Sequence, residues 1–438
     1  MMDRAWSLRV AGRVVASTAA VMTLGCAAVT SSAPVASAAA STLTFSVVQP
    51  FSGPTAFEGP EQLAGCLAAA ALVNKSGGVM GHHIQCAPTD TKGDPADAVP
   101  AVSKMLASTT GLVGVIGPAQ TAPSTYKLIS AAHVPMFSDC GCPTLDHNST
   151  PFYFRIDPSD SLAGIAMAYW AKSRYGKNAA EVFTNGTGGQ TTVPSLLAEY
   201  SRLGGKFVFT QTLVLDQSSY RTEVAAMLAK HPSVLVTEMD PQTAGTYFSE
   251  VQQLDGGKFP KVEVTNLALK GAWIRAITSA IGNSLFAKDF VAIAPTTPRG
   301  PGYRYFKKEV VTLGSKIQDP KQYLTDSYSI ADYDSVILAA LAMNEAKSTT
   351  PSVWRKYVIP IANGTSGAKV VHSYAAGLHA IKQGKKVRYL GGNGPFDFNK
   401  YQNAAAGFQV FRYQPSSHVE KQIGAVTLAE MKRLTSSR

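Results

Sequence analysis

From residue 41 onward, apolar β-rich runs alternate with segments whose apolar residues recur at helical spacing. The first half predicts strands at 43–48, 83–87, 112–116 and 134–137, with helices at 61–74, 95–108 and 123–132. Strands that alternate with helices pair in parallel, with helices on both faces of the sheet. Ligands bind such sheets at the carboxyl ends of the strands.

The same rhythm begins again after residue 144. Strands are expected at 152–156, 181–184, 206–213, 233–237, 262–265 and 290–294, and helices at 161–175, 192–203, 220–230, 243–254 and 270–280. Two runs of this kind predict an α/β chain with two doubly wound parallel-sheet lobes.

The last third of the chain has a different pattern. Residues 327–346 predict one long helix, and residues 351–362 predict another. Residues 389–398 and 407–413 have the composition of terminal strands around a hairpin.

The N-terminus has the pattern of an export signal. Basic residues precede an almost wholly apolar run at 14–29, and small residues fill 31–40. Cleavage after Ala38 or Ala40 would satisfy the small-residue rule. The apolar run is shorter than the roughly 20 residues that a membrane span needs. We therefore treat residues 1–40 as a leader and expect the rest of the chain to act outside the cytoplasm.

A second way of ending the leader stays open. The sequence Thr23-Leu24-Gly25-Cys26 resembles a bacterial lipobox, although Leu is usual where Thr23 stands. In that case Cys26 would be lipidated and would tether the protein to the membrane, whereas cleavage after Ala38 would remove it.

The composition is that of a globular protein. Hydrophobic residues make up 45% of the chain and charged residues 16%, which excludes a disordered chain. The net charge of +11 falls to +9 without the leader, which leaves 37 basic and 28 acidic residues. The basic residues are scattered and not interleaved with aromatic residues, so no nucleic-acid partner is expected.

Motifs of the common enzyme classes are missing from the sequence. It contains no Gly-x-Ser-x-Gly elbow, no His-Glu-x-x-His pair and no phosphate-binding loop signature. We therefore expect neither an enzyme nor a cofactor nor a bound metal.

Several short runs together carry a family resemblance. They are VVQPFSGP at 47–54, NKSGGVMG at 74–81, DTKGDP at 90–95, VIGP at 115–118, FRIDPSD at 154–160, YDSV at 333–336 and GPFD at 394–397. In this order and spacing the mature chain resembles, over nearly its whole length, periplasmic-type solute-binding proteins of the branched-chain amino acid class. Those proteins are the receptor components of ABC importers.

The resemblance implies the type I periplasmic binding fold, in which two lobes joined by crossover strands close over a solute. Residues 41–157 and 296–405 would form one lobe, and residues 158–295 and 406–438 the other. It implies an exported monomer that passes a small polar or amphipathic solute, such as an amino acid or amide, to an importer permease. The alternatives are an extracellular sensing domain that signals to a partner protein and a secreted enzyme.

The resemblance also suggests binding residues in the first lobe. The family grips a carboxylate with hydroxyl residues and backbone N–H groups of the loop that here spans 117–122, where Thr121 matches the main hydroxyl contact and Gln120 lies beside it. A helix N-terminus favours an anion there, although Thr121 can equally serve as a helix cap. The next loop, Cys140-Gly141-Cys142, departs from the small residues usual in the family.

Further departures leave the solute open. Glu58, with Phe57 beside it, stands where the family has an aromatic residue, and Asn266 stands near a family acid that holds the ligand amine. Loop residues that could line the cleft of the second lobe are Asn185, Thr187, Glu238 and Asp240, of which the two acids could supply the missing charge. Tyr328 matches an aromatic residue near the site, or is a core tyrosine.

Four cysteines follow the leader, and an even number in an exported chain suggests disulfides. In a sheet of order 2-1-3-4-5, Cys66 and Cys86 would lie on neighbouring elements near the carboxyl edge, which favours their pairing. Cys140 and Cys142 would then form a local pair. A zinc site or a redox pair are the alternatives for these two, although neither has the usual ligand set or spacing.

Overall fold

The computed structural model describes residues 42–256, 258–295, 300–404, 407–415 and 419–436. The predicted leader, with the lipobox cysteine Cys26 and the cleavage positions Ala38 and Ala40, lies outside the described residues. Within the described ranges, no helix combines the length and the hydropathy that crossing a bilayer requires.

The first sheet contains five parallel strands in the order β2-β1-β3-β4-β5, which is the 2-1-3-4-5 order expected from the family resemblance. The strands are β1 (Leu43–Gln49), β2 (Ile84–Asp90), β3 (Leu112–Ile116), β4 (Met136–Ser138) and β5 (Tyr153–Arg155). The helices between them are α1 (Glu58–Lys75), α2 (Pro95–Ser108), α3 (Ala122–Ala131) and the short 3₁₀ helix η1 (Pro143–Leu145).

The second sheet contains seven strands in the order β14-β13-β10-β9-β8-β6-β7. They are β6 (Asn178–Thr184), β7 (Lys206–Leu213), β8 (Val234–Glu238), β9 (Lys261–Val264), β10 (Phe290–Pro295), β13 (Phe408–Gln414) and β14 (Val419–Val426). Its helical elements are α4 (Asp160–Tyr175), α5 (Thr187–Arg202), α6 (Arg221–Leu228), α7 (Pro241–Leu254), η2 (Asn266–Leu269), α8 (Gly271–Ile281), α9 (Asn283–Asp289) and α15 (Leu428–Ser436). Strands β6 to β10 are parallel, and the β13–β14 hairpin joins the sheet antiparallel to β10.

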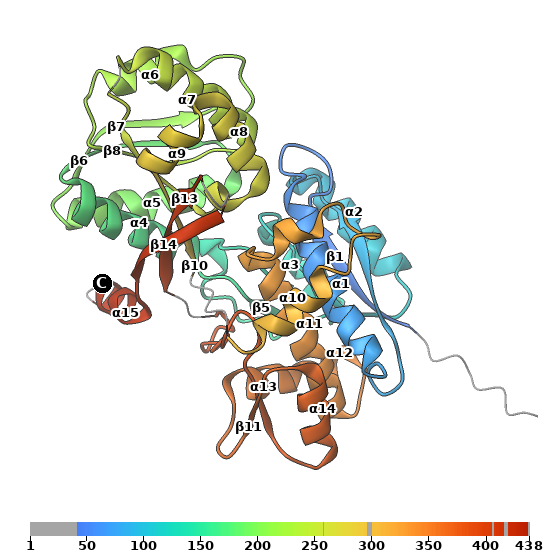
Figure 1. The fold of residues 1–438 in the computed structure, drawn as a ribbon. Helices are drawn as coiled ribbons and strands as arrows, with labels where there is room; N and C mark the ends of the chain where they lie inside the picture. The colour runs from blue at the N-terminus through green and yellow to red at the C-terminus, as the bar shows by residue number, and fades with distance from the viewer. Residues whose placement is uncertain (1–41, 257, 296–299, 405–406, 416–418, 437–438) are drawn as a thin grey trace, which may run out of the picture. The chain divides into compact units, whose positions relative to one another are not determined.

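A third group of elements packs beside the first sheet. It comprises α10 (Tyr303–Val310), η3 (Pro320–Tyr323), α11 (Ser327–Ala346), α12 (Pro351–Trp354), η4 (Arg355–Tyr357), α13 (Val358–Asn363), β11 (Lys369–Val371), α14 (Tyr374–Lys382) and β12 (Val387–Tyr389). The orange helices α10 and α11 lie beside the blue helix α1 in Figure 1, and they share one hydrophobic core with the first sheet.

Each sheet has a hydrophobic core on both faces. On the first sheet, α1, α10 and α11 bury one face and α2 and α3 the other. On the second, α7, α8 and α9 pack on one face and α4, α5 and α15 on the opposite face. Two sheets covered on both sides are the doubly wound α/β lobes that the alternating sequence pattern predicted, so the predicted fold class is confirmed. We call them the first and second lobe; the residue at which each crossover changes lobe remains a prediction.

The predicted helix over 351–362 is wrong in one respect, because the structure divides it into α12, η4 and α13. Pro360 has no amide hydrogen to donate to the carbonyl of Lys356, so an unbroken α-helix would lose a hydrogen bond there. A 3₁₀ turn at η4 takes up the break.

The predicted strand over 389–398 is also wrong beyond Tyr389. The backbone N–H groups of Gly392 and Asn393 donate to the carboxylate of Asp334, at 3.0 and 2.7 Å, instead of to a neighbouring strand. The Tyr389 hydroxyl donates to the same carboxylate at 2.8 Å. The segment is therefore a loop wrapped around a buried acid, and the terminal hairpin is β13–β14.

Candidate functional site

A cavity of about 420 Å³ lies between the two lobes, lined by loops that follow strands of both sheets. Phe57 and Glu58 reach it from the first lobe after β1, and Gln120 does so after β3. This is the location that parallel sheets favour for ligands, because the carboxyl ends of their strands and the N-termini of their helices converge there. The volume lies in the range of small-molecule sites.

The structure brings most of the expected binding residues together around this cavity. Its lining includes Phe57, Glu58, Gln120, Cys140, Gly141, Cys142, Asn185, Glu238, Asp240, Asn266 and Tyr328. Thr121 is buried and does not line the cavity; it directly precedes α3. Thr187 is the first residue of α5, and its side chain lies outside the described part of the structure.

Acidic side chains dominate the charged lining. Seven carboxyl groups line the cavity, namely those of Glu58, Glu61, Asp94, Asp139, Asp160, Glu238 and Asp240. Two cationic side chains, Lys92 and Lys270, are among the described residues of the lining. Solvation and charge pairing of these groups therefore decide what the cavity can hold.

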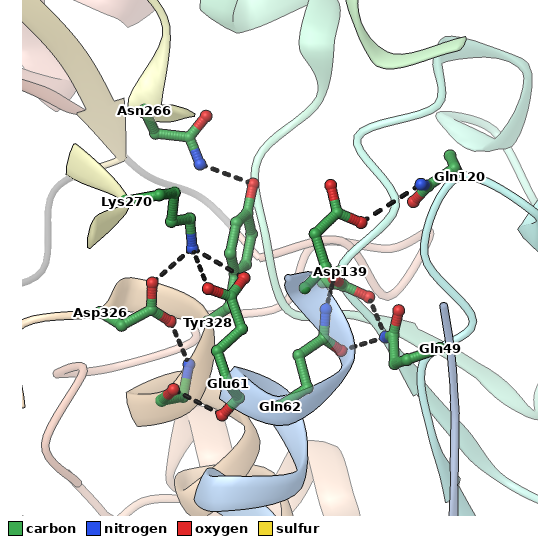
Figure 2. Close-up of polar contacts among 11 residues, drawn as sticks. Gln49, Glu61, Gln62, Gln120, Asp139, Asn266, Lys270, Asp326 and Tyr328 are labelled. Atoms are coloured by element: carbon green, nitrogen blue, oxygen red, sulfur yellow. Dashed lines mark hydrogen bonds and ion pairs between the residues drawn. The ribbon is translucent and has the colours of Figure 1, made fainter. Parts of the chain in front are cut away.

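A buried polar network holds Asp139 at the end of β4. Gln49, the last residue of β1, donates from Nε2 to Oδ1 of Asp139 at 3.1 Å and also to the side-chain oxygen of Gln62. Gln62 in turn donates from Nε2 to Oδ2 of Asp139 at 2.6 Å (Figure 2). Burial outweighs these hydrogen bonds and raises the pKa of Asp139.

Glu58 begins helix α1 and faces the loop after β3. Its Oε2 accepts a hydrogen bond from Gln120 Nε2 at 3.2 Å. Burial, followed by the neighbouring charge of Asp139, raises the pKa of Glu58 to about 7. A carboxyl group thus occupies the edge of the loop at which the resemblance implies a bound carboxylate.

Lys270, between η2 and α8, joins the two lobes through an ion-pair cluster. Its Nζ lies 2.8 Å from both carboxylate oxygens of Glu61 on α1 and also bonds Asp326, the N-cap of α11 (Figure 2). The side chains of Lys270, Glu61 and Asp326 are 7%, 3% and 9% exposed. Burial alone would lower the pKa of Lys270, but the two carboxylates outweigh it and raise that pKa, which keeps the ammonium charged.

Tyr328, on the first turn of α11, forms a second link across the lobes. Its hydroxyl accepts a hydrogen bond from Asn266 Nδ2 at 2.9 Å. The ammonium of Lys270 lies 4.5 Å from the centroid of the Tyr328 ring, within the range of a cation–π contact. Tyr328 therefore supports the ion-pair cluster and also presents its ring to the cavity.

The second lobe contributes its own acidic group at the cavity. Glu238 ends β8, and burial followed by the charge of Asp160 raises its pKa to about 7. Asp240 caps α7, with Oδ1 accepting from the amides of Gln242 and Thr243 at 3.0 and 3.1 Å. The other oxygen of Asp240, Oδ2, is buried and has no hydrogen-bond partner among the described residues.

The Cys140-Gly141-Cys142 loop closes one wall of the cavity. Cys140 and Cys142 are joined by a disulfide with their Cα atoms 5.2 Å apart, so neither sulfur is a free thiol that could bind a metal. A Cβ on Gly141 would lie 1.9 Å from Oδ1 of Asp160, so any larger residue at this position would displace the Asp160 side chain. Cys66 and Cys86 form the other disulfide, which ties α1 to β2.

Sequence reasoning missed Lys270, Glu61, Asp139 and Asp160 as cavity residues. A usable signal exists for three of them: Glu61 lies one helical turn after Glu58, and Asp139 and Asp160 follow strands of the first sheet. The link from Lys270 to Glu61 spans 209 residues, and no local pattern predicts a contact of that kind. Within the described residues, no three or more His, Cys, Asp or Glu side chains are arranged so that they could hold a metal ion.

Comparisons with known proteins agree with this geometry. The family model described as "Periplasmic binding protein" matches residues 42–411. No match was found among curated proteins. Many solved structures share the fold.

Three of these structures illustrate the range of ligands. A leucine-binding protein from Thermotoga maritima is 14% identical, with a TM-score of 0.68, 88% of this chain covered and 99% of that chain. A solute-binding protein from R. palustris in complex with benzoate is 14% identical, with a TM-score of 0.68 and coverage of 88% and 96%. A branched-chain amino acid binding protein from Streptococcus pneumoniae in complex with isoleucine is 15% identical, with a TM-score of 0.67 and coverage of 88% and 98%.

The chain belongs to the periplasmic binding protein family and has the type I fold of that family. That family is one of binding proteins rather than enzymes. At 14–15% identity the solved structures define the fold and leave the solute to be argued from this chain's own side chains.

Proposed function

We propose that this protein is the exported receptor of an ABC importer, and that it captures a small polar or amphipathic solute in the cavity between its lobes and delivers it to the permease. The observation that carries the proposal is the cavity itself, lined by loops of both lobes at the carboxyl ends of the parallel strands of the two sheets. A solute held there touches both lobes only when they are closed, so binding shifts the protein toward its closed state.

The lining suits a solute with both polar and apolar parts. Phe57, Leu215, Leu267 and Tyr328 supply apolar or aromatic surface, and carboxyl and amide groups stand between them. The related structures with leucine-binding, isoleucine-bound and benzoate-bound descriptions fit small solutes of this size class.

Binding without turnover is the first test. The mature chain is heated with and without a panel of amino acids, amides, amines and aromatic acids, and the unfolding temperature is recorded. A solute at about 100 times its dissociation constant should stabilise the protein by about 2.7 kcal/mol. The solute recovered afterwards should be chemically unchanged; a converted product would contradict the receptor proposal.

A blocking variant tests where the solute binds. Asn185 is exposed on the loop between β6 and α5 and lines the cavity, so Asn185→Trp should fill the entrance without disturbing the core. The matched control is Ser218→Trp, an exposed position outside the cavity lining. We expect Asn185→Trp to abolish the thermal shift and Ser218→Trp to keep it. Equal shifts in both would place binding elsewhere.

The partner and the location follow from the family and need their own measurement. Cells that lack this gene should lose uptake of the radiolabelled solute and regain it on complementation. Normal uptake by the deletion strain would favour a sensing role instead. Mass spectrometry of the exported protein would distinguish a lipid on Cys26 from a chain that begins after Ala38.

A further inference from the structure

The charges around the cavity are not balanced. Lys270 is paired with Glu61 and Asp326, and Lys92 lies 3.1 Å from Asp97, so both lysines of the lining already have anionic partners. Six carboxyl groups of the lining form no ion pair with any described cationic side chain. One of them, Asp94, is exposed to solvent; the other five, which the argument uses, are those of Glu58, Asp139, Asp160, Glu238 and Asp240.

These carboxyl groups come from both lobes and lie within electrostatic reach of one another. The charge of Asp139 raises the pKa of Glu58, after burial, and the charges of Asp160 and Glu58 do the same for Glu238. Neutral donors satisfy part of the group, since Gln120 bonds Glu58 and Thr191 bonds Asp160 at 2.5 Å. Burying several like charges around one cavity is costly unless a positive charge enters it.

Asp240 adds an independent observation. Its side chain is 7% exposed and lines the cavity, and its Oδ2 has no hydrogen-bond partner in the described structure. A buried carboxylate oxygen without a partner costs free energy in the absence of a donor. An ammonium or guanidinium group in the cavity would supply that donor.

The same lining disfavours a carboxylate on the solute. In the first lobe, Glu58 faces the loop after β3 through Gln120, and Asp139 starts the loop after β4. A solute carboxylate placed against either loop would therefore meet a protein carboxyl group. The ammonium of Lys270 cannot compensate, because it already faces two carboxylates.

Resting on the receptor function proposed above, we propose that the solute is an organic cation, bearing ammonium or guanidinium groups on a short apolar body and no carboxylate. The cation contacts the carboxyl groups of both lobes, with Glu58 on one side and Glu238 and Asp240 on the other. The apolar body lies against Phe57, Leu215 and Leu267.

Matched probes test the charge requirement. Agmatine and cadaverine differ from arginine and lysine only by the absence of the carboxylate, and isothermal titration of the mature protein compares the members of each pair. We expect agmatine or cadaverine to bind at least tenfold more tightly than its amino acid, with affinity falling as salt rises. Amino acids that bind as tightly as their decarboxylated partners would overturn the proposal.

Variants test the carboxyl groups themselves. Asp240→Asn keeps a helix-capping side chain and removes the charge, and Glu238→Gln removes the other charge at nearly constant shape. Each should weaken cation binding by about tenfold or more, because it removes a partly buried charge that faces the ligand. The control is Asp397→Asn, which removes a charge from a surface pair with Arg388, and it should leave the affinity unchanged. Equal affinities in all three variants would overturn the proposal.

The outcomes separate this inference from the receptor function. If isoleucine or benzoate binds in the cavity and the cations do not, the receptor function stands and the charge class is wrong. If cationic, zwitterionic, anionic and neutral probes all fail to bind, both are wrong.

Discussion

The substitution Lys270→Met would test the ion-pair cluster between the lobes. Methionine keeps most of the volume of the lysine stem but removes the ammonium that contacts both oxygens of Glu61 and the carboxylate of Asp326. Two buried carboxylates would then face each other without a cation. Breaking a buried pair in this way typically costs about 3–5 kcal/mol.

Protonation limits that cost and makes it depend on pH. One of the two carboxyl groups can lose its charge by taking up a proton. For an ordinary pKa near 4.3, this protonation costs about 4 kcal/mol at pH 7.5 and about 1 kcal/mol at pH 5. The folded variant has the raised carboxyl pKa, so its stability relative to the parent falls as pH rises. We expect a loss of about 3 kcal/mol at pH 7.5 and of about 1 kcal/mol or less at pH 5.

Urea denaturation at the two pH values measures this loss, followed by tryptophan fluorescence and by circular dichroism. Lys386→Met is the control, since Lys386 pairs with Glu345 at the surface with 65% of its side chain exposed, and it should cost less than about 1 kcal/mol. Adding Glu61→Gln to Lys270→Met should recover stability at pH 7.5, because one carboxylate replaces two. A loss below about 1 kcal/mol at pH 7.5, or an equal loss at both pH values, would refute the reasoning.

Three further predictions use the disulfide, the cavity wall and a buried acid. Replacing Cys66 and Cys86 together by serine removes a cross-link with a sequence separation of 20, which should lower the free energy of unfolding by about 3 kcal/mol. Urea titration without a reducing agent measures this change. An unchanged midpoint of the urea transition would contradict the prediction. Gly141→Ala places a Cβ against Asp160, and we expect calorimetry to show weaker solute binding, whereas unchanged affinity would mean that the loop is not part of the site. Burial raises the pKa of Glu238 to about 7 in the folded protein, so the solute-free protein should lose stability as the pH rises from about 4.5 through 7. Glu238→Gln should reduce this loss of stability. If the variant and the parent show identical pH profiles of thermal unfolding, Glu238 does not cause the loss.

The sheets could be predicted from the sequence because their information is local. Each βα unit shows in the sequence as a short apolar run followed by helical spacing, which predicts parallel strands. The strand order of the first sheet is not contained in that pattern and comes from the family resemblance. The prediction of a strand over 389–398 failed because the contacts that determine the structure of this segment are not local. Its backbone donors go to Asp334, which lies 58 residues away from Gly392, and composition carries no trace of that contact.

Some residues of the candidate site could likewise be predicted from the sequence, and others could not. Glu238 and Asp240 could be placed at the cavity because they lie at or just after the end of a strand of the second sheet, whereas Glu58 and Gln120 are placed there by the family resemblance. The pairing of Lys270 could not be predicted, because Glu61 and Asp326 reach it from other parts of the chain. From the sequence alone, Lys270 would be taken for a cation that can bind a solute carboxylate. In the structure, its charge is already compensated by the two acids.

The likeness to the solved structures extends to the fold but not to the choice of solute, because the pairing of Lys270 changes the charge that a solute meets. The fold is kept at 14–15% identity because it depends on apolar periodicity and parallel pairing, which many sequences satisfy. The choice of solute depends on a few charges at the strand ends, and here the cation of the second lobe is already bound by acids of the first. A cavity whose two lysines are paired with acids, and whose remaining carboxyl groups are not paired, is suited to the solute that we propose, one that brings the positive charge with it.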